Sequence, residues 1–292
     1  MSSDVSPSSY GFRWLPIVVG LVAAAAIMVR GCQTGPFGRT QVVALTPEQE
    51  THLGAQTYQK VLDQSDVIAE GPIVDGVREI GLRLAAASQD PDVLKMLQLR
   101  PQKFDWKFRV IRSRQVNAFC LPGGKVVVYT GILPVAQTVG GLATVMGHEI
   151  GHALAHHGAE RMAQQEMVQL GQAAVAGSLE RMDPQAQKQV MGVLGAGAQF
   201  GVLLPFSRKH ESEADHIGLL LMAAAGYDPK NSITFWHRME QMGAGSKQSE
   251  FYSTHPSHEH RAQDLTDWQK EAQALYARSK KQDSDRKLPG VP

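Results

Sequence analysis

Cysteine is scarce in this 292-residue chain, which contains only Cys32 and Cys120. Two cysteines exclude a disulfide-stapled scaffold and a zinc site built from thiolates. A surplus of one charge is also missing, since 29 Lys and Arg balance 28 Asp and Glu, and no long basic run suggests a nucleic-acid partner. A composition of 43% hydrophobic and 20% charged residues excludes a disordered chain and a membrane protein with many spans. Histidine is plentiful instead, because seven of the 11 histidines fall in two clusters, at residues 148–157 and 255–260.

The N-terminal segment contains the first of two long uncharged stretches. Residues 14–29 are mostly apolar and lie between Arg13 and Arg30. This stretch is short for a bilayer crossing, which needs about 20 residues, and long for the core of a secretory signal. We expect residues 1–30 to be a retained anchor helix, with a cleaved signal or a lipid on Cys32 as alternatives. All three imply export or membrane attachment, so we expect the following domain to be periplasmic or otherwise extracytoplasmic, although arginines on both sides leave the orientation open.

Two helices are predicted after a linker at residues 31–45, which contains several glycines and a proline. Residues 46–49, with the sequence TPEQ, supply an N-cap, a proline at the first helical position and a capping box, so a helix should begin there and run to residue 63. Apolar residues spaced by three and four predict a second helix over residues 73–87.

Three extended runs then indicate a small sheet. Apolar and charged residues alternate in residues 106–110, and the runs 116–121 and 126–130 are separated by a turn with the sequence PGG. We expect a three-stranded antiparallel sheet. Further helices are predicted near residues 137–158, 163–181, 185–203, 210–225, 229–243 and 259–282. The predicted fold is therefore mainly α with a small three-stranded β-sheet, of the α+β class.

Two later segments, residues 190–206 and 266–292, complete the predicted fold. Residues 190–206 carry no charge, and we favour a buried helix with its exit loop over a membrane insertion, because Pro205 and several glycines argue against a simple span. Residues 266–292 are predicted to be a charged C-terminal helix and tail, with residues 277–292 frayed.

An H-E-x-x-H motif at residues 148–152 carries the strongest chemical signal. Its flanking residues are helical in pattern, and a spacing of four places His148 and His152 on one helix face. Two imidazoles on one face can hold a Zn²⁺ ion at about 2.0–2.1 Å. Glu149 adjoins the first ligand, where a carboxylate can take the proton of a water that the metal has acidified.

A catalytic zinc site needs a third protein ligand and an open position. Glu211 and Asp215 are four residues apart and share one face of a predicted helix, whereas Glu213 points elsewhere. Glu211 can therefore bind the metal while Asp215 accepts a hydrogen bond from a ligand histidine. We expect His156 to lie one turn too far along the helix to reach the metal, and both His156 and His157 to be helix-end residues.

Four blocks of sequence together make a pattern more specific than the zinc motif alone. They are NAFCLPGG at 117–124, GHEIGH at 147–152, SRKHESEAD at 207–215, and THP at 254–256 followed by Arg261. The pattern resembles the gluzincin family of the Ste-type CAAX prenyl proteases, HtpX, the mitochondrial Oma-type protease and the bacterial β-barrel-assembly-enhancing protease. Because the multiple spans of the prenyl proteases and HtpX are absent, the soluble, singly anchored branch is the better comparison. The resemblance implies a zincin-like metallopeptidase domain over residues 46–265.

The resemblance also implies roles for individual residues. The zinc ligands would be His148, His152 and Glu211, one zinc ion would bind per chain, and Glu149 would be the general base. The strand at residues 115–120 would be a sheet edge that pairs with an extended substrate. Backbone groups of an unpaired edge suit this use, and they recognise peptides largely regardless of sequence. The residues implied in substrate binding are Asn117, Ala118 and Phe119.

The resemblance gives the second histidine cluster alternative roles. By resemblance, His255 either occupies the fourth zinc position and keeps the enzyme latent, or stabilises the oxyanion of the tetrahedral intermediate. Arg261 either orients this loop, meets the substrate carbonyl, or caps a helix. His258 and His260 match nothing in the family pattern, so we expect them on the surface.

We therefore predict a zinc metalloendopeptidase, attached to a membrane through its N-terminal segment, that cleaves misfolded or unassembled membrane or envelope proteins. Its partners would be polypeptide substrates and the membrane. The alternative is a zinc-stabilised chaperone that binds client proteins without cutting them. The presence of Glu149 argues against that alternative, because a structural zinc site needs no general base.

Overall fold

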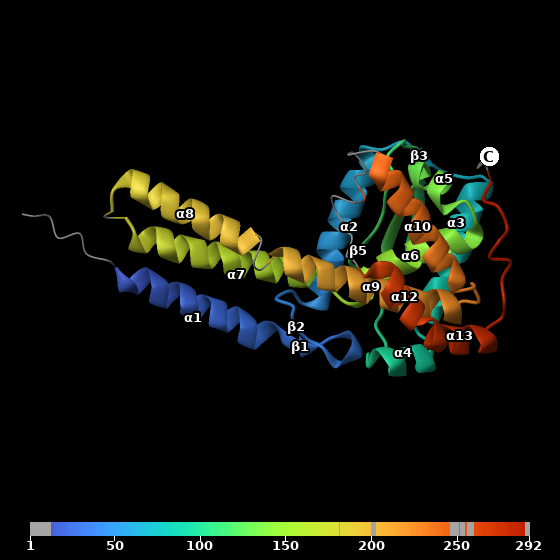
Figure 1. The fold of residues 1–292 in the computed structure, drawn as a ribbon, viewed down its shortest axis with the longest axis horizontal. Helices are drawn as coiled ribbons and strands as arrows, with labels where there is room; N and C mark the ends of the chain where they lie inside the picture. Colours follow the sequence, from blue (N-terminus) through green and yellow to red (C-terminus); the bar gives the residue numbers. More distant parts are fainter. Residues whose placement is uncertain are drawn as a thin grey trace, which may run out of the picture. The chain divides into compact units, whose positions relative to one another are not determined.

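The computed structural model describes residues 13–180, 182–199, 203–245, 251, 255 and 260–289. The chain divides into two compact units, whose elements are labelled in Figure 1. The three-helix unit comprises Met1–Gln33, Val42–Ala44 and Glu160–Phe206, and the α/β unit comprises Thr34–Gln41, Leu45–Ala159 and Ser207–Pro292.

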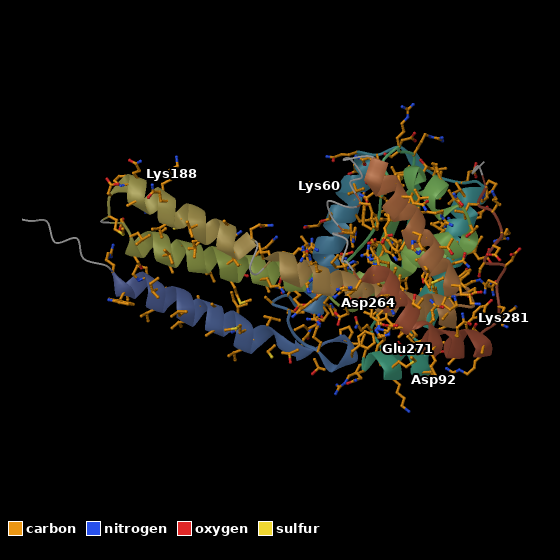
Figure 2. All side chains as sticks on the ribbon, in the orientation of Figure 1. Lys60, Asp92, Lys188, Asp264, Glu271 and Lys281 are labelled. Carbon is orange, nitrogen blue, oxygen red and sulfur yellow. The ribbon has the colours of Figure 1, made fainter. Side chains whose placement is uncertain are left out.

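Small residues bring the first two helices of the three-helix unit together. The unit contains α1 (Trp14–Gly31), most of α7 (His157–Ser178) and α8 (Pro184–Ala198). α1 runs antiparallel to α7, because Arg13 forms a 2.7 Å ion pair with Glu180 while Gly20 faces Ala174, whose Cβ would lie 2.6 Å from a Cβ built on Gly20. α1 is long and apolar enough to cross a membrane, and only 11% of its most apolar window is buried. Lys188, the one charged residue of α8, points away from α7 (Figure 2).

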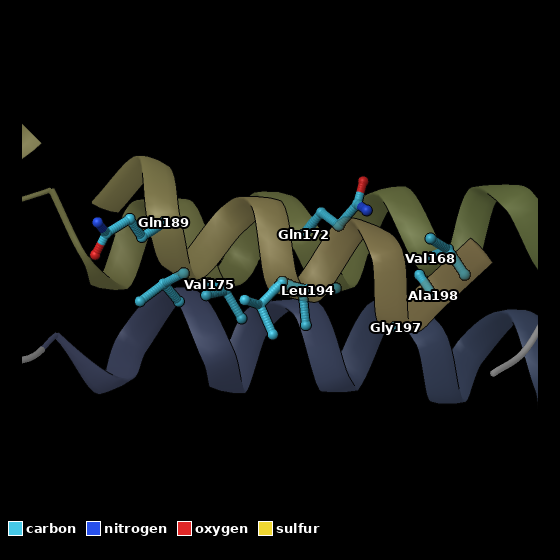
Figure 3. Close-up of a pocket in the computed structure, with 10 residues that line it drawn as sticks. Val168, Gln172, Val175, Gln189, Leu194, Gly197 and Ala198 are labelled. Carbon is cyan, nitrogen blue, oxygen red and sulfur yellow. The ribbon is translucent and has the colours of Figure 1, made fainter. Parts of the chain in front are cut away.

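α8 is not the buried helix that the sequence predicts for residues 190–206. None of its residues is buried, and Val193 remains 76% exposed. An apolar groove of about 810 Å³ lies along α7 and α8, and Figure 3 shows Val175 and Leu194 among the residues that line it. The prediction of burial is wrong for the described part of this stretch, because the groove between α7 and α8 leaves the apolar side chains of α8 uncovered among the described residues. Residues 200–202 lie outside the described residues.

The segment predicted as a linker, residues 31–45, contains short regular elements. β1 (Cys32–Thr34) and β2 (Thr40–Val42) pair as a two-stranded sheet. The turn between them includes a 3₁₀ element, Pro36–Gly38, in which Phe37 has a positive φ of 53°.

The α/β unit is built around a four-stranded sheet with the strand order β3–β4–β6–β5. The strands are β3 (Val67–Ile68), β4 (Lys107–Ile111), β5 (Ala118–Leu121) and β6 (Lys125–Tyr129). β4 and β6 are parallel, with Lys107 opposite Lys125, while the outer pairs are antiparallel. The prediction of three antiparallel strands is therefore wrong in strand number and in the direction of one pair. β5 is an edge strand among the described residues, as predicted.

Helices cover both faces of this sheet. α2 packs on one face, where Tyr58 contacts Ile111 and Val127, and α3 with α6 packs on the other face, against residues such as Val110 and Val128 (Figure 1). The capping box predicted for α2 is confirmed: the side chain of Thr46 accepts a hydrogen bond from the backbone of Gln49 and the reverse bond also forms. The helices are α2 (Pro47–Asp63), α3 (Pro72–Ala87), α4 (Pro91–Leu97), α5 (Leu133–Ala136), α6 (Val139–Leu154), α9 (Leu204–Ala224), α10 (Lys230–Gly245), α12 (Arg261–Asp267) and α13 (Gln269–Arg278), with a 3₁₀ turn at Thr130–Ile132.

The C-terminal tail is folded onto the α/β unit, so the prediction of a frayed tail over residues 277–292 is wrong for the described residues up to 289. Leu288 is 3% exposed. The backbone N–H of Val139, at the start of α6, donates to the carbonyl of Arg286 at 2.9 Å. The tail therefore caps the buried helix that carries the zinc motif. Residues 290–292 lie outside the described residues.

Candidate metal centre

A close crossing of α6 and α9 brings the two halves of the predicted site together. α6 carries the H-E-x-x-H motif, and α9 carries the acidic residues that follow. At the crossing, Gly147 lies against Gly218: a Cβ built on Gly218 would lie 2.7 Å from the backbone nitrogen of His148. Gly151 similarly approaches the backbone of Ala214, with 2.9 Å from a built Cβ to the carbonyl oxygen. Only glycine permits this approach, and it sets the spacing between the ligand-bearing helices.

Four side chains converge at this crossing with the geometry of a metal site. His148, His152, Glu211 and His255 each offer a ligand atom, and these atoms lie within 4.8 Å of one another. The Nε2 atoms of the two α6 histidines are 3.1 Å apart, and each lies 3.4 Å from a carboxylate oxygen of Glu211. His255 Nδ1 lies 3.1 Å from Glu211 Oε1 and 3.4 Å from His148 Nε2. A tetrahedron with ligand bonds of about 2.0–2.1 Å has edges of about 3.3–3.4 Å, so this donor set fits Zn²⁺.

Asp215 and Arg261 support His148, the first candidate ligand, on the side of its ring away from the metal position. His148 Nδ1 donates to Asp215 Oδ1 at 2.8 Å, which leaves Nε2 facing the metal position. Arg261 Nε donates to Asp215 Oδ2 at 2.7 Å and Nη2 donates to Glu211 at 3.2 Å. The guanidinium also stacks on Trp236, with its carbon 3.8 Å from the ring centre. Arg261 is 2% exposed and compensates two buried carboxylates, so it is placed to orient ligands rather than to meet a substrate carbonyl.

A second set of residues, which the sequence analysis did not connect with the metal, holds the other ligand histidine. His152 Nδ1 lies 2.8 Å from His157 Nδ1, and His157 Nε2 lies 2.7 Å from Glu213 Oε2. Arg39 completes the series with a 2.9 Å ion pair to Glu213. His157 is 2% exposed and its ring stacks on that of His210, with 4.2 Å between centres. His157 is a helix-end residue, as predicted, because α7 begins there, but its burial and its contact with His152 were not predicted.

A break in the helix explains why helical spacing missed this contact. His156, between α6 and α7, has a φ of 55°, which redirects the chain before His157. The side chain of His156 instead meets the carboxylate of Glu50 at 3.0 Å, away from the ligand set. A histidine five residues after a ligand would face away from it on a continuous helix, so the sequence gives no local signal for this arrangement.

Glu149 sits beside the ligands with a free oxygen. The side chain is buried, and its Oε1 has no hydrogen-bond partner within the described part of the chain, although His255 Nε2 lies 3.5 Å away. Burial raises the pKa of Glu149 above its ordinary value, while the nearby histidines and a hydrogen bond from the backbone of Cys120 oppose the rise. Such a carboxylate is a stronger base than a solvated one, as general-base catalysis requires.

Burial and neighbouring charges push the two α6 histidines in opposite directions. Burial lowers the pKa of His148, but the Asp215 carboxylate outweighs that effect and raises the value to about 10. Burial lowers the pKa of His152 to about 3, with the charges of His148 and His255 adding to the effect and Glu211 opposing it. His148 differs because it also has the Asp215 carboxylate as a partner.

His255, the first residue of the second histidine cluster, and the edge strand also lie near the candidate ligands. Phe251 stacks on the ring of His255, with 4.4 Å between centres, and His255 is 9% exposed. His260 is exposed, as predicted, while Thr254, Pro256 and His258 lie outside the described residues. The edge strand approaches the site through Cys120, whose backbone contacts Glu149. Among the residues implied in substrate binding, Ala118 and Phe119 lie in β5, and Asn117 directly precedes it.

Comparisons with known proteins agree with this geometry. The profile of Peptidase family M48 matches residues 80–269. The mitochondrial metalloendopeptidase OMA1 of Schizosaccharomyces pombe is 43% identical over 169 residues, which cover 58% of this chain and 48% of that protein. The protein of the same name from Saccharomyces cerevisiae is 31% identical over 258 residues, which cover 82% of this chain and 70% of that protein. The beta-barrel assembly-enhancing protease of Escherichia coli is 27% identical over 232 residues, covering 78% of this chain and 45% of that protein. The chain thus spans about half the length of the S. pombe and E. coli proteins.

Proposed function

Because this chain belongs to Peptidase family M48, we propose that its metal centre is that of a zinc metalloendopeptidase. The observation that carries the proposal is the nearly tetrahedral set of two histidines, a glutamate and a further histidine, with Glu149 beside it. His255 would close the set as in a structural site, so the distinguishing feature is Glu149: a structural site has no use for an adjacent buried carboxylate with an oxygen that lacks a hydrogen-bond partner among the described residues.

Each residue of the site would have a separate role in peptide hydrolysis. His148, His152 and Glu211 would hold the ion, which when bound supplies Lewis acidity that activates water and polarises a peptide carbonyl. Glu149 accepts the proton of the attacking water and delivers it to the leaving amine. Its raised pKa suits both transfers, since the group must first gain and then lose a proton near neutral pH. Arg261 and Asp215 keep the ligands in place during the reaction.

The substrate would bind as an added strand on β5. Among the described residues β5 is the outermost strand, so its outer edge would offer backbone groups to a peptide, and its Cys120 backbone adjoins the general base. A peptide paired along Asn117, Ala118 and Phe119 would bring its backbone to Glu149. Strand pairing needs an extended and accessible chain, so unfolded polypeptides are the substrates that this site would favour.

α1 would tether the enzyme to a membrane. One N-terminal apolar helix of suitable length fits membrane anchoring, and relatives named as mitochondrial or as beta-barrel assembly-enhancing proteases support a role near membranes. We propose that the clients are misfolded or unassembled membrane or envelope proteins and that the α/β unit is extracytoplasmic. Retention of α1 as a helix is favoured over cleavage by its small-residue contact with α7 at Gly20 and Ala174.

His255 would make the enzyme latent. Its Nδ1 lies at the fourth corner of the donor set, where a substrate carbonyl or water would otherwise enter. A client that displaces His255 would open this position. The oxyanion-stabilising role is the alternative, and it predicts the opposite effect of removing the imidazole.

The test uses the full chain in detergent and measures bound zinc and cleavage of casein. The proposal predicts one zinc per chain, weak cleavage by the wild type, and at least a hundredfold loss in Glu149→Gln with zinc retained. The His255→Ala variant should cleave casein faster than the wild type if His255 is a latch, and more slowly if His255 stabilises the oxyanion. If all three proteins bind zinc and none cuts unfolded casein, the protease proposal fails and the chaperone alternative is favoured.

A further inference from the structure

We propose that His157, Glu213 and Arg39 form a positioning relay for the ligand His152. The relay is a continuous series of short polar contacts: 2.8 Å from His152 to His157, 2.7 Å from His157 to Glu213, and 2.9 Å from Glu213 to Arg39. It rests on the proposed function, since its purpose is to orient a zinc ligand.

The contacts allow only one arrangement of protons when His152 binds a metal. A neutral His152 that presents Nε2 to the ion must carry its proton on Nδ1. His157 Nδ1 must then accept that proton's hydrogen bond, so the proton of His157 is on Nε2, where it donates to Glu213. Glu213 can only accept, because Arg39 holds it as a carboxylate through two nitrogen atoms. The charge pair at one end thus fixes the tautomer of the ligand at the other end.

The other α6 ligand has the same kind of support in a shorter form. His148 donates directly to Asp215, which is paired with Arg261. Each ligand histidine therefore leads to a carboxylate of α9 and then to an arginine. Partners of this kind orient metal ligands, and their removal typically weakens metal binding about 10–100-fold. Because His157 is buried and stacked on His210, its imidazole has little freedom to leave the relay.

The test measures metal binding directly, without a peptide substrate. Zinc affinity is measured by competition with a chromophoric chelator, and the ligand field by the visible absorption spectrum of the Co²⁺-loaded chain. We expect His157→Leu and Glu213→Gln to weaken zinc binding 10–100-fold and to alter the Co²⁺ spectrum. His157→Gln should recover most of the affinity, because its amide can accept from His152 and donate to Glu213. Arg39→Gln provides a milder test of the far end of the relay.

His156→Ala is the matched control, because this neighbouring histidine also pairs with a carboxylate but does not contact a ligand. It should change zinc affinity less than twofold. If His157→Leu lowers the melting temperature of the metal-free chain but leaves zinc affinity and the Co²⁺ spectrum unchanged, His157 is merely structural and the relay is overturned. Loss of proteolysis with normal metal binding in the wild type would overturn the proposed function alone. A wild type that binds no zinc would overturn both.

A separate observation in the three-helix unit carries a second inference: the groove along α7 and α8 lies in the hydrocarbon of the bilayer that holds α1. α1 and α7 are antiparallel, and Arg13 pairs with Glu180, so the uncharged residues 167–178 of α7 run beside the uncharged part of α1. If α1 crosses the membrane, this part of α7 lies at the same depth. α8 returns along α7 from the same end, as the contact between Gln187 and the Ala176 carbonyl shows.

Lipid acyl chains match the surface that these helices leave uncovered. The groove exposes almost no polar surface, and the valines of α8 beside it, Val190 and Val193, are 41% and 76% exposed. Apolar side chains exposed to this extent along one helix indicate a nonaqueous neighbour. Lys188 (Figure 2) and the Arg13–Glu180 ion pair lie toward the hairpin end, which is where a headgroup region would begin.

Depth-dependent quenching tests this inference. In a Cys32→Ser background, Val193→Cys and the matched Lys188→Cys are labelled with an environment-sensitive fluorophore, and the full chain is reconstituted in phosphatidylcholine–phosphatidylglycerol vesicles. A spin label deep in the acyl chains should quench the probe at position 193 at least threefold more than the probe at position 188. Equal or absent quenching would overturn the inference. Quenching that depends on protein concentration, without dependence on the lipid label, would assign the groove to a second copy of the chain.

Discussion

The glycine contact between α6 and α9 makes Gly218→Ala a sharp test of how the backbone sets the metal site. The added Cβ would lie 2.7 Å from the His148 nitrogen and 2.8 Å from the Gly147 carbonyl carbon. Both neighbours are backbone atoms of a buried helix, so no side-chain rotation can relieve the overlap. α9 must move away from α6 by about 0.7 Å to restore ordinary contact near 3.4 Å.

Moving α9 away from α6 should change the free energy of unfolding and the zinc affinity by different amounts. Overpacking of a well-packed core costs about 1–3 kcal/mol, and replacing a helical glycine with alanine returns about 0.5–1 kcal/mol. The net loss of unfolding free energy should therefore be about 0–2.5 kcal/mol. Zinc binding should suffer more, because metal–ligand distances tolerate only about 0.2 Å, and Glu211 moves with α9 relative to the histidines of α6. We expect zinc affinity to fall at least tenfold.

The measurement pairs urea unfolding of the metal-free chain with zinc competition against a chelator. Gly192→Ala in α8 is the matched control, because a Cβ built there meets nothing within 4 Å. The control should be stabilised by about 0.5–1 kcal/mol with unchanged zinc affinity. If Gly218→Ala behaves like Gly192→Ala in both assays, the helix crossing does not set the geometry of the site and the reasoning is wrong.

Three further predictions concern buried charge, pH and thiol reactivity. Arg261→Leu leaves the buried carboxylates of α9 without their cation, so urea unfolding should show a loss of about 3–5 kcal/mol, whereas Arg261→Lys should restore part of it. Burial lowers the pKa of His157 well below its ordinary value of 6.5, so its stabilising contribution is present above pH 6.5 and is lost as the pH falls. Between pH 7.5 and 5.5 the free energy of unfolding of the metal-free wild type should fall by about 1.4 kcal/mol more than that of His157→Leu. Parallel curves of unfolding free energy against pH would contradict this. Exposed Cys32 should react with iodoacetamide in the native chain, while Cys120, whose pKa burial raises, should react only after unfolding, as mass spectrometry can show.

The metal ligands were predictable from sequence because helical spacing determines which side chains share a face. His148 with His152, and Glu211 with Asp215, are each four residues apart; the structure brings ligand atoms of the first three together and places Asp215 at the Nδ1 atom of His148. Strand direction was not predictable in the same way, since alternation along residues 106–110 marks a half-buried strand without indicating its partner. The parallel pairing of β4 with β6 depends on the hairpin of β5 folding back onto β6, which is a tertiary choice.

Composition was a poor guide where burial depends on distant segments. The polar residues 279–289 look like a frayed tail, yet their backbone groups bond to the start of α6 and to Gly226, and Leu288 fills a core position. The uncharged residues of α8 look like a core helix, yet none of them is buried. In both cases the deciding partner lies elsewhere in the chain, so a local pattern cannot supply it.

The acidic residues of α9 show how a helix can support a metal site from more than one face. Glu211 and Asp215 face α6, while Glu213 lies about 200° around the helix from Glu211 and would face solvent on an isolated surface helix. In this fold the chain changes direction at His156, so His157 reaches that other face and bonds to Glu213. Arg39 forms an ion pair with the same carboxylate. The same helix therefore reaches one ligand histidine directly through Asp215 and the other through Glu213 and His157. An acidic residue at position 213 would then serve metal binding rather than solubility, so Glu213→Gln should weaken zinc binding even though the residue touches no metal ligand.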